Sequence, residues 1–250
     1  MLRFILVISF VVLFLILSTP LLLIEWIMGK LGYQNAKNRS SLAIVNWAFR
    51  VCLFMSGTKI TVIGEENVPK DQAVLYIANH RSYFDILLTY VRVPRPTGYV
   101  AKKEMLKYPL LRDWMKNLHC KFLDREDMKA GLKMILDAIE DVKNGVSICI
   151  FPEGTRNPNE DPLQMLPFKE GSLKIAEKSG CPIIPMALTG SADIFEKQFP
   201  KVKKAHVIIE YGKPIYPQEL SKEERKHLGA YTQEVIEQML LKHKETSAIS

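Results

Sequence analysis

The sequence lacks the cysteine and histidine patterns that hold metals or build disulfide frameworks. Its four cysteines (Cys52, Cys120, Cys149 and Cys181) are far apart and form no C-x-x-C pair, so neither a zinc site nor a disulfide framework is indicated. We therefore expect reduced thiols in a cytosol-facing domain. H-x-H and H-E-x-x-H patterns are also missing, which argues against a metal-dependent hydrolase and leads us to expect no metal and no resident cofactor.

Internal repeats, low-complexity tracts and Gly/Ser linkers are missing as well. With 250 residues, of which 48% are hydrophobic, the chain can bury one substantial core. We expect an N-terminal membrane-anchoring and amphipathic helical region over residues 1–56 and one catalytic domain over residues 57–250.

Charged residues are absent from Phe4 to Ile24, and this run is close to the roughly 20 apolar residues that a helix needs to cross a bilayer. A cleaved signal peptide is the alternative, but its apolar region is normally only about 7–15 residues long, so a retained anchor is favoured. Pro20 is expected to kink the helix, which also fits a hairpin or a segment within one leaflet.

Basic residues are few before this run and more frequent after it, because only Arg3 precedes it while Lys30, Lys37 and Arg39 follow. The positive-inside rule then places the rest of the chain on the cytoplasmic side. Farther on, Leu42–Met55 has the pattern of an amphipathic helix, which fits a second membrane contact or a core helix equally well.

Short β-branched runs alternate with helical patterns in the remainder of the chain, which indicates an α/β fold with a mixed sheet flanked by helices. The expected strands cover residues 58–64, 73–79, 98–101, 120–124, 146–151, 182–188 and 205–212.

Two helices have clear start signals. Asp127 is expected to cap a helix whose apolar stripe includes Met128, Leu132, Ile135, Ile139 and Val142. Ser221 and Glu224 form a capping box before a helix that is expected to run to about Lys244 and to turn Val235, Met239 and Leu240 toward the body of the protein.

A first candidate site follows the second of these strands, in the run N-H-R-S-Y-F-D over residues 79–85. His80 is expected at a strand-to-helix turn, where active sites of α/β sheets collect. Asp85, in the first turn of the next helix, can reach back to one imidazole nitrogen and leave the other free as a base. Ser82-x-x-Asp85 is also a helix capping box, so a purely structural role is the alternative.

A second candidate site follows the apolar strand at residues 146–151, in the run F-P-E-G-T-R over residues 151–156. Arg156 offers a planar fork of donors for a phosphate. Gly154 permits close approach of the backbone to a ligand, while Glu153 can orient a hydroxyl or hold the arginine. The alternative is a Glu153–Arg156 ion pair at a surface turn.

Together these two runs resemble the first and third motifs of the glycerol-phosphate and acylglycerol-phosphate acyltransferase superfamily. The resemblance extends to Lys102–Leu106, to Phe122–Arg125, which is similar to the second motif, and to Cys181–Pro185, which is similar to the fourth. The second motif departs from the family at about His119, where a glycine is usual, and at Lys121, which replaces an apolar residue.

This resemblance implies an enzyme that transfers a fatty acyl group from an acyl-CoA or an acyl-carrier-protein thioester to the free hydroxyl of lysophosphatidic acid. It implies His80 as general base with Asp85 as its partner, and substrate binding by Lys103, Arg125, Glu153, Gly154, Thr155 and Arg156. Membrane lipids are then the expected partners, and nucleic acid is not. Another lysophospholipid or glycerol-3-phosphate stays open as acceptor, and a non-catalytic lipid-binding protein is the remaining alternative.

The sequence holds no G-x-S-x-G motif for a serine nucleophile. Cys149 lies within an apolar strand and is expected to be part of the core. We therefore expect direct transfer in a ternary complex without an acyl-enzyme.

Overall fold

A seven-stranded mixed sheet forms the centre of the molecule. We describe it from a computed structural model, which covers the backbone of residues 1–249 and the side chains of residues 1–245. The strands are β1 (Lys59–Ile63), β2 (Leu75–Ala78), β3 (Thr97–Lys102), β4 (Lys121–Leu123), β5 (Ser147–Ile150), β6 (Ile183–Thr189) and β7 (His206–Tyr211). Each overlaps one of the expected strands, so the predicted α/β fold with a mixed sheet is confirmed.

The strand order is β1-β7-β6-β2-β5-β3-β4. β2 pairs in parallel with both β5 and β6, and β3 pairs in parallel with both β5 and β4. β7 is antiparallel to β6 and parallel to β1. The carboxyl ends of β2, β5, β3 and β4 therefore meet at the same edge of the sheet, and their following loops are neighbours.

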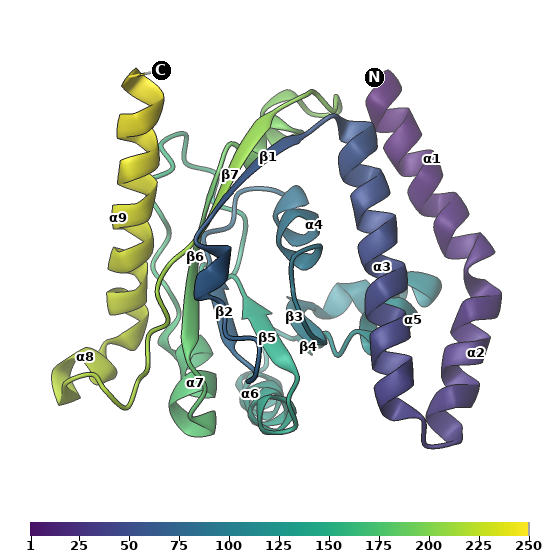
Figure 1. The fold of residues 1–250 in the computed structure, drawn as a ribbon, viewed down its shortest axis with the longest axis horizontal. Coiled ribbons are helices and arrows are strands. Elements are labelled where there is room, and N and C mark those ends of the chain that lie inside the picture. The colour runs from purple at the N-terminus through teal and green to yellow at the C-terminus, as the bar shows by residue number, and fades with distance from the viewer. Residues whose placement is uncertain (250) are drawn as a thin grey trace.

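Helices cover both faces of the sheet, with α1, α2 and α3 on one side and α9 on the other (Figure 1). The α-helices are α1 (Leu2–Leu17), α2 (Thr19–Lys30), α3 (Gln34–Ser56), α4 (Phe84–Tyr90), α5 (Pro109–Asn117), α6 (Met128–Lys143), α7 (Lys174–Ser179), α8 (Lys222–Lys226) and α9 (Leu228–Ile249). Short 3₁₀ helices are η1 (Glu65–Asn67), η2 (Lys103–Lys107), η3 (Glu170–Leu173), η4 (Ser191–Asp193) and η5 (Glu196–Gln198).

The sheet divides the core into two clusters because successive strand residues point to opposite faces. Tyr76 of β2 joins a cluster with residues of α3, α4 and α5. Leu75 and Ile77, its neighbours in the chain, join a cluster with residues of α6, α7 and α9. All three strand residues are at most 2% exposed, so β2 is buried on both faces and its carboxyl end has a fixed position.

The N-terminal apolar run forms two helices and not the single helix expected over residues 4–24. α1 and α2 are bent by 47° where they meet. Pro20 lies in the first turn of α2 and cannot donate to Ile16 O, the carbonyl four residues before it. Thr19 Oγ1 donates to that carbonyl instead, at 2.7 Å. Within the described residues no single helix passes the length and apolarity test for a membrane span, but α1 and α2 together pass it.

One side of α3 packs into the core, and another side leaves large apolar side chains exposed. Val45, Ala48 and Leu53 are buried, whereas Trp47 is 57% and Phe54 85% exposed. Core packing, one of the two alternatives for Leu42–Met55, is therefore shown. The division of the chain at residue 56 stays a prediction.

Two helix predictions need correction. Asp127 does cap α6, by accepting the N–H groups of Lys129 and Ala130, but Met128 is 90% and Leu132 62% exposed. The buried residues of α6 are Met134, Ala138, Ile139 and Val142, so its apolar stripe is covered only from its middle onward.

The C-terminal helix is also interrupted. The Ser221–Glu224 capping box is present, but α8 ends after Lys226 and α9 begins at Leu228. The Glu170 carboxylate accepts the N–H of Gly229 at 2.8 Å, which supports the new helix start. Met239 and Leu240 are buried and Val235 packs against the same cluster, as predicted.

Candidate active site

The four candidate segments follow the carboxyl ends of four adjacent parallel strands. His80 comes after β2, Glu153 after β5, Lys103 after β3 and Arg125 after β4. Ligands of open α/β sheets bind outside the carboxyl ends of the strands, so the sheet order itself brings these segments to one edge. Cys181–Pro185 differs, because it leads into β6 at the opposite edge.

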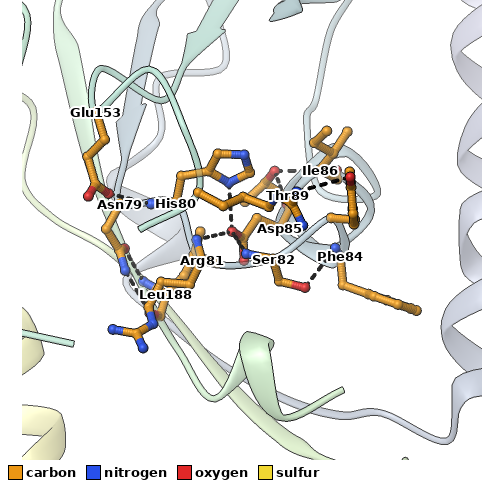
Figure 2. Close-up of polar contacts among 12 residues, drawn as sticks. Asn79, His80, Arg81, Ser82, Phe84, Asp85, Ile86, Thr89, Glu153 and Leu188 are labelled. Carbon is orange, nitrogen blue, oxygen red and sulfur yellow. Dashed lines mark hydrogen bonds and ion pairs between the residues drawn. The ribbon is translucent and has the colours of Figure 1, made fainter. Parts of the chain in front are cut away.

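His80 and Asp85 form the predicted pair (Figure 2). His80 Nδ1 is 2.9 Å from Asp85 Oδ2, and the carboxylate is fully buried. Because an ionised carboxylate only accepts hydrogen bonds, Nδ1 carries the proton and Nε2 keeps its lone pair. Nε2 has no hydrogen-bond partner within the described part of the chain, and the side chain is 16% exposed. This nitrogen is therefore available as a base.

Asp85 also caps the start of the helix, as the alternative reading predicted, and it does so through the same oxygen, Oδ2, that contacts His80. Asp85 Oδ2 accepts the backbone N–H groups of Arg81 and Ser82, each at 2.7 Å, and Ser82 Oγ accepts the N–H of Phe84 at 3.0 Å. The two roles are compatible because one carboxylate oxygen can accept from several donors. The turn thus fixes the carboxylate, and the carboxylate orients the imidazole.

Glu153 holds the backbone of His80. Its Oε1 accepts the N–H of His80 at 2.7 Å and its Oε2 accepts the N–H of Leu166 at 2.9 Å. Asn157 N donates to the carbonyl of His80 at 2.6 Å, and the imidazole stacks on Phe151 with ring centroids 4.2 Å apart. Burial raises the pKa of Glu153, while the two N–H donors oppose that rise. Phe151 and Glu153 of the F-P-E-G-T-R segment, and Asn157 directly after it, therefore hold His80 through three separate contacts.

Gly154 occupies a backbone conformation that favours glycine. Its φ is 76°, and a Cβ at this position would lie 2.9 Å from Lys169 Nζ. A positive φ carries no steric penalty for glycine. This glycine lets the chain turn sharply between Glu153, which faces His80, and the exposed Thr155.

Arg156 does not pair with Glu153, so that alternative is wrong. Its guanidinium lies 3.7 Å from the centroid of the Tyr83 ring, and its Nη2 donates to Tyr83 Oη at 3.0 Å. Its Nη1 is 3.5 Å from Glu196 Oε1, which also accepts the N–H of Tyr83 at 2.7 Å. Stacking and hydrogen bonds hold the plane of the guanidinium in one orientation.

A pocket of about 920 Å³ opens beside this arginine, lined by Arg81, Thr155, Arg156, Asn157, Glu196 and Lys197 among others. Arg81 is held there by donating from Nη2 to Asn159 O at 2.5 Å, while its Nη1 is buried without a partner in the described structure. Three cations against two carboxylates, Glu160 and Glu196, line the pocket. This balance suits an anionic group.

Lys103 and Arg125 lie at the same edge of the sheet but do not line this pocket. Lys103 Nζ is 2.5 Å from Asp124 Oδ2, and this hydrogen bond lowers the pKa of Asp124. Arg125 is exposed and makes no hydrogen bond or ion pair with any residue that the structure describes. Their predicted substrate-binding roles stay predictions.

Sequence reasoning missed Arg81, Asn157 and Glu196. Arg81 directly follows His80, so its place in the motif was the available signal. Asn157 and Glu196 carry no local signal, because their roles come from contacts with His80 and with Arg156.

The four cysteines are free, and Cys149 is fully buried, which raises the pKa of its thiol. In the described part of the chain no group of three His, Cys, Asp or Glu side chains is placed to hold a metal ion.

A family model described as Acyltransferase matches residues 59–189, which include the whole of both motifs around His80 and Glu153. The chain belongs to the acyltransferase family. The expected resemblance is therefore confirmed, over the segment that contains β1 to β6.

Curated relatives agree with this assignment. A 1-acyl-sn-glycerol-3-phosphate acyltransferase of Cocos nucifera is 33% identical over 71% of this chain and 56% of its own length. The protein of the same name from Saccharomyces cerevisiae is 30% identical over 77% of this chain and 62% of its own. This chain thus spans less than two thirds of either. The Borreliella burgdorferi protein of that name is 30% identical, over 84% of this chain and 82% of its own length.

A crystal structure of the 1-acyl-sn-glycerophosphate (LPA) acyltransferase PlsC from Thermotoga maritima has the same fold. It superimposes with a TM-score of 0.77, at 28% sequence identity, over 97% of this chain and 95% of that chain. The similarity therefore includes the N-terminal helices as well as the sheet of this acyltransferase.

Proposed function

We propose that this acyltransferase moves a fatty acyl group from an acyl thioester to the free hydroxyl of 1-acyl-glycerol-3-phosphate and so forms phosphatidic acid. The observation that carries the proposal is the buried Asp85 carboxylate on Nδ1 of His80, which leaves Nε2 available as a base. The names of the relatives support this acceptor.

The phosphate of the acceptor fits the pocket beside His80. Arg156 presents a guanidinium plane fixed by Tyr83, and Arg81 has a buried Nη1 with no partner among described residues. Charge-assisted hydrogen bonds from guanidinium to phosphate are among the stronger ones in proteins. The pocket adjoins the turn that carries His80, because Arg81 follows His80 in the chain and Asn157 donates to the His80 carbonyl at 2.6 Å. In this proposal a phosphate bound there leaves the hydroxyl of the same small molecule within reach of Nε2.

Catalysis then needs one acyl transfer and two proton transfers, one to His80 and one from it. His80 Nε2 takes the proton of the acceptor hydroxyl, and the oxygen attacks the thioester carbonyl to give a tetrahedral oxyanion. As the oxyanion collapses, the carbon–sulfur bond breaks and the thiolate takes the proton from His80. General base catalysis typically contributes about 10²–10⁴-fold, so positioning of both substrates supplies much of the remaining rate.

The N-terminal helices are proposed to hold this site at a membrane. α1 and α2 expose many large apolar side chains, among them Leu2, Leu17, Leu23, Ile24 and Trp26. A cluster of exposed large apolar side chains is typical of a membrane or protein contact. Both the acceptor and the acyl chain are lipids, so a membrane-bound site avoids their full transfer into water. The catalytic domain is expected on the cytoplasmic side.

The test measures thiol release from long-chain acyl-CoA, and separately from acyl-carrier protein, with and without lysophosphatidic acid. We expect release that depends on the acceptor, formation of phosphatidic acid, and a loss of about 10²–10⁴-fold in His80→Ala. His227→Ala, at an exposed position on α8's end, is the matched control. Full activity of His80→Ala would contradict the mechanism, and activity only with glycerol-3-phosphate or another lysophospholipid would contradict the acceptor.

A further inference from the structure

A second pocket lies on the opposite edge of the sheet from His80. It has a volume of about 510 Å³ and lies between α3 and the segment that leads into β3. β3 runs parallel to β5, and β5 runs parallel to β2. The beginning of β3 and the end of β2 are therefore at opposite edges of the sheet, and this pocket is separate from the candidate active site.

Three arginines line this pocket: Arg39 and Arg50 of α3, and Arg95 before β3. None of the three forms an ion pair with a residue that the structure describes, and no carboxylate is among the described lining residues. Glu65, which pairs with the nearby Arg92 at 3.0 Å, is already engaged. The pocket thus concentrates positive charge that the protein itself leaves uncompensated.

The polar groups of the pocket have unused hydrogen-bonding capacity. Arg95 donates from Nη2 to the carbonyl of Lys70, but its Nε is buried without a partner in the described chain, as is Oδ1 of Asn46. Arg39, Asn46 and Arg50 are separated by seven and four residues, so they lie on one face of α3. Convergent arginines with free donors are suited to the several oxygens of a phosphate.

We propose that this arginine pocket, defined by Arg39, Asn46, Arg50 and Arg95, binds the phosphate of an anionic phospholipid headgroup. Phe54 lies one helical turn after Arg50 and is 85% exposed, and Trp47 beside Asn46 is 57% exposed. Basic residues and exposed aromatic side chains on one helix match the boundary between headgroups and acyl chains. The proposal rests on the membrane contact of the proposed function, and a soluble phosphate is the other possible source of the same chemistry.

The test uses Arg39→Gln/Arg50→Gln in the full chain. Both arginines are exposed on α3, so the fold does not depend on them. A control with a greater loss of charge is Lys129→Gln/Lys133→Gln/Lys143→Gln, at exposed positions of α6. Binding to sedimented vesicles of phosphatidylcholine is compared with binding to vesicles that also contain phosphatidylglycerol, and inorganic phosphate is titrated in a separate thermal-shift experiment.

The double variant is expected to bind phosphatidylglycerol vesicles about 30-fold more weakly, since each basic residue at an anionic surface contributes roughly fivefold. Its binding to pure phosphatidylcholine, and its activity on lysophosphatidic acid in detergent, are expected to be unchanged. The lysine variant should lose less than about twofold. An equal loss in both variants, or none in the double variant, would overturn the proposal.

A stabilisation by inorganic phosphate that the double variant lacks, with vesicle binding intact, would overturn the lipid assignment and identify a soluble ligand. A different result would contradict the proposed function, namely that the wild-type protein transfers no acyl group. Vesicle binding could still differ between the arginine variant and the lysine variant in that case.

Discussion

The two edges of the sheet differ in how their charged side chains are held. At the carboxyl-end edge, Asp85 accepts three hydrogen bonds through Oδ2, Glu153 accepts two and Arg156 is stacked on Tyr83. At the opposite edge, Arg39 and Arg50 have no ion-pair partner among the described residues. The first arrangement fixes geometry, whereas the second leaves charge available for a ligand.

This difference fits the two proposed roles. A base must be held in one orientation before substrate arrives, because misplacement by about 1 Å can cost about 10²-fold in rate. A site for a lipid headgroup needs charge more than geometry, since headgroups approach in many orientations. Substitutions that disturb the position of His80 should therefore change kcat, and those at the opposite edge should leave it unchanged.

The largest effect is expected from Asp85→Asn. The amide oxygen can replace Oδ2 as acceptor, but the side chain no longer carries the negative charge that stabilises the protonated imidazole. The amide NH2 group also takes the place of Oδ1, which is buried without a partner among the described residues. We expect kcat to fall by about 10³-fold, measured as phosphatidic acid formed under saturating substrates. Asp137→Asn, at an exposed position of α6, is the control. Retention of most of the activity in Asp85→Asn would mean that the pair is only a helix cap.

Glu153→Gln tests whether the F-P-E-G-T-R segment positions His80. Glutamine has one acceptor oxygen for two buried backbone donors, so one N–H, of His80 or Leu166, is left without a partner. The free energy of unfolding should fall by about 1–3 kcal/mol, and kcat should fall by up to about 10²-fold with little change in KM. Thermal unfolding and steady-state kinetics measure both. Exposed Glu66 offers the matched change, Glu66→Gln. A change in KM alone would instead place Glu153 in contact with substrate.

Arg156→Lys should act on binding. The charge is kept, but the planar fork and its stacking on Tyr83 are lost. KM for lysophosphatidic acid is expected to rise by about tenfold, the equivalent of one charge-assisted hydrogen bond, with kcat nearly unchanged. Arg225→Lys on α8 is the control. An equal rise in KM for monoacylglycerol, which has no phosphate, would argue against phosphate binding by Arg156.

The smallest effect, at the opposite edge, is expected from His119→Asn. His119 has φ of 60°, which asparagine also tolerates. Burial lowers the pKa of His119 in the folded protein, so the unfolded chain takes up a proton first as pH falls below about 6.5. Wild-type stability should therefore decrease below that pH, and the asparagine variant should lose less.

Chemical unfolding at a series of pH values measures this difference, with exposed His227→Asn as the control. A change in kcat of the His119 variant would contradict the expectation that substitutions at the opposite edge leave catalysis unchanged.

Several features could be predicted because their causes are local. The strands follow from short β-branched runs, and Asp127 and Ser221 cap their helices through residues within one turn. His80 and Asp85 are five residues apart, so a single turn joins them. His119 is similar: the departure from a usual glycine falls at a positive φ, which is the conformation that glycine favours.

Other features could not be predicted because they depend on distant segments. The exposure of Met128 and Leu132 at the start of α6 depends on which distant segments pack on that helix, and its own periodicity does not contain this information. Arg156 pairs with Glu196, 40 residues later, and neither residue signals the other in the sequence.

By itself, the sequence determined which segments become strands, where the helices capped by Asp127 and Ser221 begin, and the identity of the chemical groups at each turn. Backbone dihedral preferences and hydrogen bonds within a few residues are sufficient for that. Only the tertiary structure decided that Glu153 holds His80 across 73 positions of sequence and that Arg95 joins the arginines of α3. Such contacts arise when parallel strands align their ends and helices cover the two faces of the sheet, and these are consequences of packing the whole chain.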